Sequence, residues 1–222
     1  MAEGPKVVSE LIMQDVFEVK RIYAVEEWLE EGKKSGRIPG ELITVVKDFE
    51  LEKLSSLTNP HLVLGVFAKR KNEEINIDQE RVTLMLENIR DPGNFGTIIR
   101  IADWFGIKSI VCSPGCVDMY NTKVVQSTMA SLGRVKLHYE KLESVLERFP
   151  QTSLYAAALQ GKALPSISLK LPAFLLIGNE GSGISEQLLE RADERVSIPG
   201  EGGAESLNAA VATGILLYAF RP

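Results

Sequence analysis

The sequence predicts an α/β protein with a mainly parallel sheet, and three observations support that fold class. Short apolar runs typical of buried strands alternate with helical patterns between residues 81 and 222. A polar, charged stretch without periodicity, Lys69 to Asp78, precedes them and is typical of a linker. Two apolar runs near the C-terminus each lead into a glycine-rich loop, as in pockets at the ends of parallel strands. The sequence therefore predicts a small α/β unit, residues 1–78, followed by a larger unit, residues 79–222.

The first unit combines helical and strand patterns. Apolar residues at helical spacings predict a helix over residues 6–31, and the stretch from Gly32 to Gly40 has the composition of a loop. The other elements predicted are a strand from Leu42 to Val46, a helix from Leu51 to Leu57 and a strand from Leu62 to Ala68.

The second unit begins with a buried strand, Val82 to Leu86, and a helix that Asn94 is well placed to cap. We expect this helix to run to about Phe105, with Arg100 pointing away from its apolar face and Trp104 packing rather than acting in function. Further strands are predicted at Ser109–Cys112, Val135–Tyr139, Ser153–Leu159, Phe174–Ile177 and Val196–Ile198, with helices over 122–132 and Lys141–Phe149.

The final helix is rich in Ala, Leu and Ile. Ser206 is expected to be its N-cap, with Asn208 in its first turn. Its apolar face is expected to contain Leu207, Val211, Gly214, Ile215 and Tyr218. So apolar a face must be buried, either against the sheet or against a second subunit.

Composition excludes several classes of protein. The chain has 222 residues, of which 45% are hydrophobic and 25% charged, as is usual for a globular protein. It contains no apolar run long enough to span a bilayer, and its first residues do not have the pattern of a signal peptide. Cys112 and Cys116 lack the neighbours of a zinc site, so no metal is expected, and two free thiols suit a reducing cytoplasm.

Charge is distributed unevenly. Residues 1–80 carry 11 Lys and Arg against 16 Asp and Glu, a net charge of −5, whereas the remaining residues carry 14 of each. Nucleic-acid binding must therefore rely on local clusters such as Lys33, Lys34 and Arg37 or Lys69, Arg70 and Lys71. The alternative is that these clusters are solvated surface.

The two C-terminal glycine loops indicate the kind of ligand. Neither follows the phosphate-binding pattern of a nucleotide site, and from Ala173 to Glu190 there is no Lys or Arg, while Glu180 lies within the loop. An uncharged or cationic ligand held by backbone groups fits better than a polyphosphate. The alternative is that both loops are merely tight turns.

Three segments in series resemble motifs one, two and three of the SpoU (TrmH-like) branch of the SPOUT RNA methyltransferases. They are Asn88-Ile-Arg-Asp-Pro-Gly-Asn-Phe-Gly onward to Asp103, Leu176-Ile-Gly-Asn-Glu-Gly-Ser-Gly-Ile, and Ile198-Pro-Gly-Glu-Gly-Gly-Ala-Glu-Ser-Leu-Asn. The similarity covers roughly residues 81–220. Residues 3–70 resemble, more faintly, the L30e-like substrate-binding module of several rRNA 2′-O-methyltransferases.

The resemblance implies a C-terminal deep trefoil knot, an exception to the rule that chains avoid knots, and a homodimer that binds S-adenosyl-L-methionine. It implies methylation of a ribose 2′-hydroxyl of RNA. The catalytic positions carried over are Asn94, Arg100, Glu180, Ser206 and Asn208. The cofactor-binding positions carried over are Ala158, Leu159, Ile177, Gly178, Asn179, Gly181, Ile198 and Leu207.

The substrate suggested is rRNA rather than tRNA. The chain shows no extension after motif three of the kind found in some tRNA-modifying members, and the first unit resembles an rRNA-binding module. Motif three departs from the family pattern, reading Ile-Pro-Gly where Ile-Pro-Met is usual. A non-catalytic RNA-binding or ribosome-assembly protein with the same fold is the main alternative. A nucleotide-dependent oxidoreductase is disfavoured because no G-x-G-x-x-G loop joins a strand to a helix.

Overall fold

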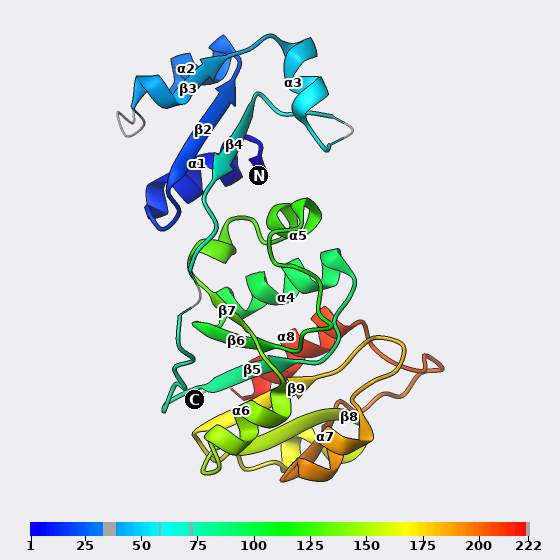
Figure 1. Ribbon diagram of the computed structural model, residues 1–222. Helices are drawn as coiled ribbons and strands as arrows, with labels where there is room; N and C mark the ends of the chain where they lie inside the picture. Colours follow the sequence, from blue (N-terminus) through cyan, green and yellow to red (C-terminus); the bar gives the residue numbers. More distant parts are fainter. Residues whose placement is uncertain (33–38, 58, 72, 221–222) are drawn as a thin grey trace.

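The computed structural model describes residues 1–32, 39–57, 59–71 and 73–220, and these residues form two β-sheets (Figure 1). The N-terminal sheet has four strands in the order β1-β4-β2-β3, and the C-terminal sheet has six in the order β10-β8-β9-β5-β6-β7. The basic cluster Lys33, Lys34 and Arg37 lies outside the described residues.

The N-terminal sheet is mixed. Its strands are β1 (Ala2–Glu3), β2 (Val19–Ala24), β3 (Ile43–Val45) and β4 (Val63–Phe67), and its helices are α1 (Pro5–Gln14), α2 (Glu26–Gly32) and α3 (Asp48–Leu54). Strand β4 is antiparallel to β1 and β2, whereas β3 is parallel to β2.

The prediction of one helix over residues 6–31 is wrong at its centre. Helix α1 ends where Asp15 adopts a left-handed conformation, with φ of 52° and its amide bonded to the Ile12 carbonyl. The chain then returns as strand β2, which buries Ile22 and Ala24. No Gly or Pro marks this turn, so the apolar spacing ran through a helix, a strand and a second helix.

Every strand pair in the C-terminal sheet is parallel, as the alternation of strands and helices predicts. The strands are β5 (Val82–Leu86), β6 (Ser109–Cys112), β7 (Lys136–Tyr139), β8 (Ser153–Ala163), β9 (Ala173–Ile177) and β10 (Glu194–Ser197). All residues of the three central strands β5, β6 and β9 are buried, which explains their nearly continuous apolar sequences.

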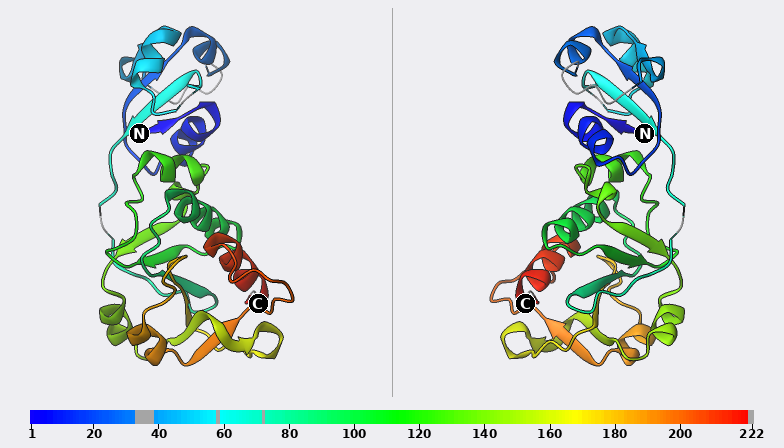
Figure 2. Two further views of the ribbon diagram at one scale, coloured as in Figure 1. Left: turned by 90° about the vertical axis from the view of Figure 1, so that its right-hand side faces the viewer. Right: turned by 90° about the vertical axis from the view of Figure 1, so that its left-hand side faces the viewer.

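Helices cover both faces of this sheet. Helices α4 (Pro92–Trp104), α5 (Thr122–Ser127) and α8 (Ala209–Ala219) lie on one face, and α6 (Leu142–Arg148) and α7 (Glu186–Arg191) lie on the other (Figures 1 and 2). Helix α7 was not predicted. Helix α5 ends before the predicted residue 132, because Met129 and Ala130 take left-handed conformations that stop it.

Both predicted helix caps are corrected. Asp91 caps α4 by accepting the amide of Asn94 at 2.7 Å, so Asn94 lies inside the first turn. Asn208 caps α8 by accepting the amides of Ala210 and Val211, whereas Ser206 precedes the helix. In both cases the cap is the residue that directly precedes the first helical residue, where a side-chain oxygen can accept the free amides of the first turn.

The side chain of Trp104 and the predicted apolar face of the last helix were expected to be buried, but both are exposed in the single chain. Trp104 is 84% exposed, and the face of α8 with Val211, Ile215 and Tyr218 points to solvent. Helix α8 buries instead Ala209, Ala210, Thr213, Leu216 and Leu217. Among the described residues, no helix combines the length and apolar character needed to cross a bilayer.

The stretch between the sheets contains no helix or strand in its described part, but it lies against the C-terminal unit. Glu73 pairs with Lys136 of β7, and Ile77 is buried among the side chains below α6. One apolar core runs from Val8 and Leu11 of α1 into the α4 and α5 side of the large sheet. The two sheets therefore share packing across the predicted boundary at residue 78.

Candidate active site

Side chains from three separate loops form one hydrogen-bonded network. The amide nitrogen Nδ2 of Asn94 donates to Oε1 of Glu180 at 2.6 Å, and Nδ2 of Asn208 donates to Oδ1 of Asn94 at 2.8 Å. These residues lie 86 and 114 positions apart in the sequence. The fold thus brings together three of the five predicted catalytic residues, one from each motif.

Helix N-termini hold two members of this network. Asn94 lies in the first turn of α4, and Asn208 caps α8, the helix that packs beside α4 (Figure 2). The backbone amides at both helix ends give this region a positive local potential, which favours the Glu180 carboxylate nearby. The Asn208 side chain is therefore oriented by backbone amides, and the Asn94 side chain by Glu180 and Asn208.

The loop after β9 is held by Asn179. Its Nδ2 donates to the Asn88 carbonyl at 2.8 Å, and its Oδ1 accepts the amides of Gly181 at 2.9 Å and Ser182 at 3.1 Å. The Asn179 side chain, predicted to bind the cofactor, thus makes hydrogen bonds that fix the shape of the loop. Asn88, which has a left-handed φ of 55°, joins this loop to the end of β5.

Gly178 has no room for a side chain. A Cβ atom added there would lie 2.5 Å from the Ile184 nitrogen and 2.6 Å from the Gly183 oxygen. The loop can fold back on itself, with Asn179 and Gly183 paired as a bridge, only because position 178 is glycine. The glycine therefore sets the shape of the loop that carries Glu180.

The predicted cofactor residues lie on, or in the segments directly after, the neighbouring strands β10, β8 and β9. Pairing of β8 with β10 jumps from Ala156↔Arg195 to Lys162↔Val196, so the residues between, including Ala158 and Leu159, bulge out of the ladder. Leu159 is 75% exposed, and Ile198 is half-buried. An exposed apolar side chain beside two glycine loops is suited to contact a bound ligand.

Arg100 and Ser206 stay outside the network. Both side chains are exposed, and neither makes a side-chain hydrogen bond or ion pair with another residue in the described part of the chain. Arg100 is six positions after Asn94 on the same helix, which places it about 9 Å further along the axis and on a different face. The side chains of Asn94 and Arg100 therefore leave α4 in different directions.

Sequence reasoning missed two acidic residues of this region. Asp91 caps α4, and the buried Glu87 accepts the amide of Ser185 at 2.8 Å, fixing the end of the Glu180 loop. Acidic residues directly after a buried strand and before Pro92 were the signal that could have found them. Glu87 also borders a cleft of about 500 Å³ on the side of α6 and α7, which no predicted site residue lines.

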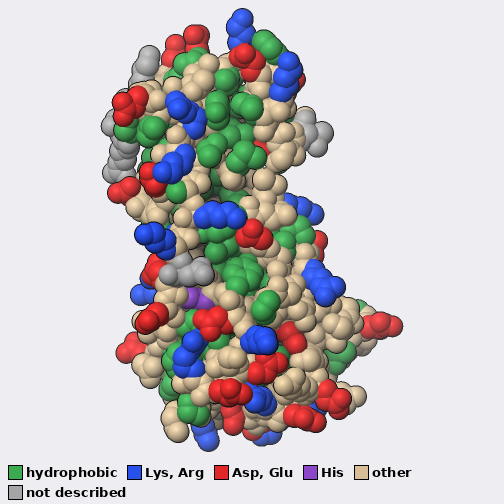
Figure 3. Space-filling model, in the orientation of Figure 1, with side chains coloured by type: hydrophobic (Ala, Val, Ile, Leu, Met, Phe, Trp, Pro, Cys, Tyr) green, Lys and Arg blue, Asp and Glu red, His purple; other side chains and the backbone are tan. Residues whose placement is uncertain are grey.

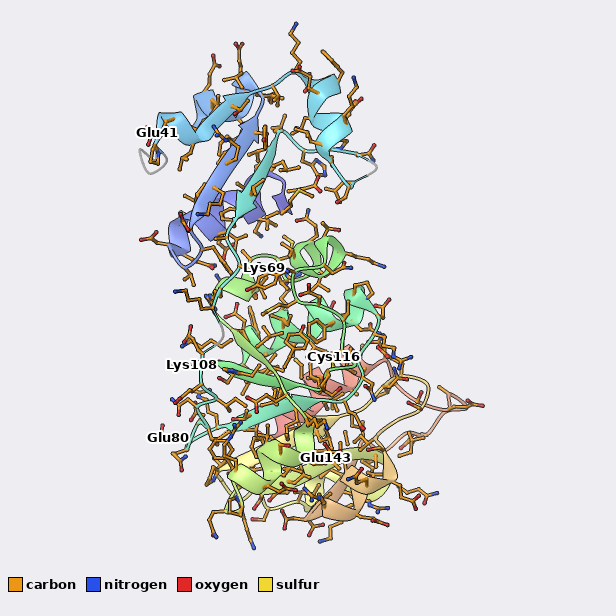
Figure 4. All side chains as sticks on the ribbon, viewed as in Figure 1. Glu41, Lys69, Glu80, Lys108, Cys116 and Glu143 are labelled. Atoms are coloured by element: carbon orange, nitrogen blue, oxygen red, sulfur yellow. The ribbon has the colours of Figure 1, made fainter. Side chains whose placement is uncertain are left out.

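Cys112 is the last residue of β6, and Cys116 lies in the loop that follows (Cys116 is labelled in Figure 4). Both thiols are free and buried, and Cys116 also contacts the Leu86 carbonyl at 3.3 Å. Hydrogen bonding from Cys112 lowers the pKa of Cys116 to about 7, while burial raises the pKa of Cys112. Among the described residues, no group of three or more His, Cys, Asp or Glu side chains could hold a metal ion.

A parallel sheet with polar, glycine-rich segments meeting at the carboxyl ends of its strands, and without a phosphate-binding sequence, defines an α/β protein with a site for a ligand other than a polyphosphate. Residues 81–218 match the SpoU rRNA methylase family, and the chain belongs to that family. It is 32% identical over 194 residues to the 23S rRNA (guanosine(2553)-2′-O)-methyltransferase RlmP of Bacillus subtilis, which covers 85% of this chain and 78% of that enzyme.

Solved structures extend the similarity to the N-terminal unit. A putative RNA methyltransferase of the TrmH family from Porphyromonas gingivalis has a TM-score of 0.86 at 32% identity, covering 99% of this chain and 88% of its own. An AdoMet-bound rRNA methyltransferase from Sinorhizobium meliloti has a TM-score of 0.84 at 29% identity, covering 98% and 84%. Both sheets of this chain are therefore shared with these proteins.

Replacing Asn208 separates its two roles. Asn208→Ala removes the α8 cap and the bond to Asn94, and we expect a loss of about 1 kcal/mol in the free energy of unfolding. Asn208→Asp keeps an acceptor for the cap but places a carboxylate against the Asn94 oxygen, so stability stays near wild type while methyl transfer falls at least about 10-fold. Chemical denaturation and a methyl-transfer assay measure the two effects. Equal activity of Asn208→Asp and the wild type would show that the network is only structural.

Proposed function

We propose that the chain is an S-adenosyl-L-methionine-dependent RNA 2′-O-ribose methyltransferase. The observation that carries this proposal is the network of Asn94, Glu180 and Asn208, because one residue from each of the three family motifs contributes to it. If the three glycine-rich segments were only tight turns, hydrogen bonds between their polar side chains would not be expected.

The loop chemistry fits the proposed cofactor. The cofactor supplies an electrophilic methyl group on a positively charged sulfonium. Between Ala173 and Glu190 the chain has carboxylates and no Lys or Arg, so these loops would not repel a cation. The predicted contacts Ile177, Gly178 and Gly181 follow β9, Ala158 and Leu159 come from the β8 bulge, and Ile198 and Leu207 come from the segment after β10.

The proposed reaction forms a bond between the ribose 2′-oxygen and the methyl carbon, breaks the sulfur–methyl bond and releases the hydroxyl proton. Arg100 is assigned to stabilise the negative charge that develops on the 2′-oxygen. A guanidinium stays protonated at neutral pH, so the proton is assigned to a substrate phosphate or to water. Asn94 and Asn208 orient the pocket, and Ser206 is assigned to the substrate side of it.

The proposed substrate is rRNA in preference to tRNA. The similarity to RlmP and to the rRNA methyltransferase of Sinorhizobium meliloti supports rRNA, and the second of these extends over the N-terminal unit. We propose that residues 1–78 form an L30e-like unit that binds RNA. On the face drawn in Figure 3, basic and acidic side chains are interspersed, which favours recognition of a defined RNA shape over nonspecific binding.

We also propose a homodimer, a C-terminal trefoil knot and a reducing, cytoplasmic location. Membership of the SpoU family supports the knot, which the motif resemblance implies. Two free buried thiols fit a reducing compartment. The exposed apolar face of α8 supports a second subunit, because Val211, Ile215 and Tyr218 line one side of a helix.

The dimer makes a direct prediction. Ile215→Glu places a charge in the centre of the exposed α8 face and is expected to convert a dimer into a monomer, measured by light scattering after gel filtration. Val45→Glu, at a more exposed valine of β3, is the matched control and is expected to leave the mass unchanged. A monomeric wild-type protein, or a dimer that survives Ile215→Glu, would contradict the proposed interface.

A methyl-transfer assay tests the function as a whole. Purified protein is incubated with labelled S-adenosyl-L-methionine and, separately, with rRNA and tRNA lacking 2′-O-methylation. We expect label in rRNA at a ribose 2′-position, identified by resistance of the adjacent bond to alkaline hydrolysis. Cofactor binding without transfer to any RNA would favour the alternative, a non-catalytic RNA-binding or ribosome-assembly protein, and absence of cofactor binding would overturn both the cofactor and the reaction.

A further inference from the structure

Several hydrogen bonds between the two units fall on one short segment, residues 126–134, which we call the seat. The Gln126 side chain bonds the Glu3 backbone in both directions, with Nε2 to the carbonyl at 3.0 Å and Oε1 from the amide at 3.3 Å. Gln14 of α1 donates to the Ala130 carbonyl at 3.2 Å. The guanidinium of Arg70, which stacks on Phe17, donates to the Gly133 carbonyl. The N-terminal unit is thus docked on the seat rather than held only by its connection (Figure 1).

The chain leading out of the N-terminal unit is also fixed. Lys69, labelled in Figure 4 where the chain leaves this unit, lies over the Tyr120 ring and 3.6 Å from the Asp118 carboxylate. The Arg70 amide donates to the Tyr120 hydroxyl at 3.0 Å. Two residues of the basic cluster considered above for RNA binding, Lys69 and Arg70, therefore contact the C-terminal unit instead.

The seat is itself packed tightly against helix α4. Gly96 of α4 is buried against it, since an added Cβ would lie 2.5 Å from Ser127 Cβ and 2.8 Å from the Val124 oxygen. Ser131 donates to Oδ2 of Asp103, near the end of α4, at 2.7 Å. Because no space is left between the seat and α4 at Gly96, a displacement of the seat is expected to move α4 as well.

The guanidinium of Arg134, a residue of the seat, bonds both the N-terminal unit and helix α4. Its Nη1 lies 2.6 Å from Oε1 of Glu10 on α1, while its Nε and Nη2 lie 2.8 Å and 2.7 Å from Oδ2 of Asp103 on α4. The Glu10 and Asp103 side chains are 29% and 21% exposed, so both acids are mostly covered. A lysine could approach one of these carboxylates but could not bond both in fixed geometry.

We propose that Arg134 is a positioning residue that sets helix α4, with Asn94 and Arg100, relative to the RNA-binding N-terminal unit. The proposal rests on the proposed function for its kinetic consequence, but the mechanical link between α1 and α4 stands apart from it. Arg134 contacts no reacting atom; it holds the two carboxylates that fix the helix and the unit to each other. A tilt of α4 would move Arg100 away from the ribose and strain the bonds of Asn94 to Glu180 and Asn208. The backbone of the loop after β9 would still be held by Asn179, which bonds no atom of α4.

The matched variants break the bonds of Arg134 from each side. Arg134→Ala removes them, Arg134→Lys retains the charge, and Glu10→Ala removes only the contact from the N-terminal unit. Arg148→Ala and Glu18→Ala are the controls, because each breaks an ion pair confined to one unit. Two readouts are made on the full chain: hydrogen exchange of the α1 and α4 amides, and steady-state methylation of rRNA.

We expect Glu10→Ala to accelerate exchange in α4, although Glu10 lies in the other sheet's unit, and Arg134→Ala to accelerate it in both α1 and α4. In the kinetic arm, Arg134→Ala is expected to lower kcat/KM for RNA about 10-fold while the Kd for S-adenosyl-L-methionine stays within about twofold of wild type. Arg134→Lys is expected to recover part of this loss, and Glu10→Ala to raise the KM for RNA more than it lowers kcat.

The two arms fail separately. If the wild-type protein does not methylate RNA, the proposed function is wrong, and exchange in α4 of Glu10→Ala still decides the link between the units. If α4 exchanges in Glu10→Ala and Arg134→Ala as it does in the controls, the positioning role of Arg134 is wrong whatever the activity. A loss of cofactor affinity equal to the loss of kcat/KM would also overturn it, since that result indicates general disruption of the fold.

Discussion

Arg100→Ala is expected to reduce methyl transfer by about 10²- to 10³-fold, the loss seen when one preorganised donor to a developing oxyanion is removed. The Arg100 side chain is exposed and forms no hydrogen bond or ion pair within the described residues, so its removal leaves the packing of α4 unchanged. We therefore expect an unchanged melting temperature and an unchanged affinity for S-adenosyl-L-methionine. The measurement is single-turnover methylation of rRNA with saturating cofactor.

Two variants sharpen this prediction. Arg100→Lys keeps a positive charge but not the planar fork, and is expected to retain only a small part of the activity. Arg148→Ala removes an arginine of similar surface setting on α6, far from the network, and is expected to behave as the wild type. Activity of Arg100→Ala within a few-fold of wild type would remove Arg100 from the chemistry and leave it a surface charge.

Gly178→Ala is expected to weaken cofactor binding about 100-fold. The added methyl would collide with the backbone of Gly183 and Ile184, and backbone atoms cannot move aside as a side chain end could. Overpacking of this kind costs about 1–3 kcal/mol, and 1.4 kcal/mol corresponds to a tenfold change in an equilibrium constant. Because the same loop carries Glu180, the methyl also displaces the carboxylate from Asn94. Calorimetric titration with S-adenosyl-L-methionine measures the change in affinity.

Gly40→Ala is the matched control for the effect of adding a methyl group. An added Cβ at Gly40 meets no atom within 4 Å, and that glycine lies in the N-terminal unit. Both the affinity and the melting temperature of Gly40→Ala are expected to stay near the wild-type values. If Gly178→Ala bound the cofactor as tightly as Gly40→Ala, the loop after β9 would not form the wall of the cofactor site.

The large sheet followed closely from its sequence because its strands are buried on both faces. Val82–Leu86 and Ser109–Cys112 were predicted to the residue, since continuous apolar runs bounded by polar turns have few other interpretations. The N-terminal unit was predicted less well. Strand β2 is part of a small sheet with one exposed side, and its pattern of buried and exposed residues is too short to distinguish from a helical pattern.

The site was predicted in its members but not in their arrangement. The motif order located Asn94, Glu180 and Asn208, which the fold joins directly, and it also named Arg100 and Ser206, which the single chain leaves apart. The roles of two residues changed: Asn94 is held by the cap rather than being the cap, and Asn179 shapes its loop through backbone bonds. Both corrections depend on which backbone groups the folded loops bring within hydrogen-bond distance of these side chains, which residue spacing alone does not specify.

The sequence by itself determined the parallel α/β sheet, the family and the three glycine-rich loops, because these depend on local composition and spacing. Only the tertiary structure decided that the loop with Glu180 meets the starts of α4 and α8, and that the N-terminal unit is docked on residues 126–134. It also decided that the apolar face of α8 is left exposed. These features depend on contacts between residues more than 80 positions apart, and the energy of such a contact is defined only once the fold has brought the partners together.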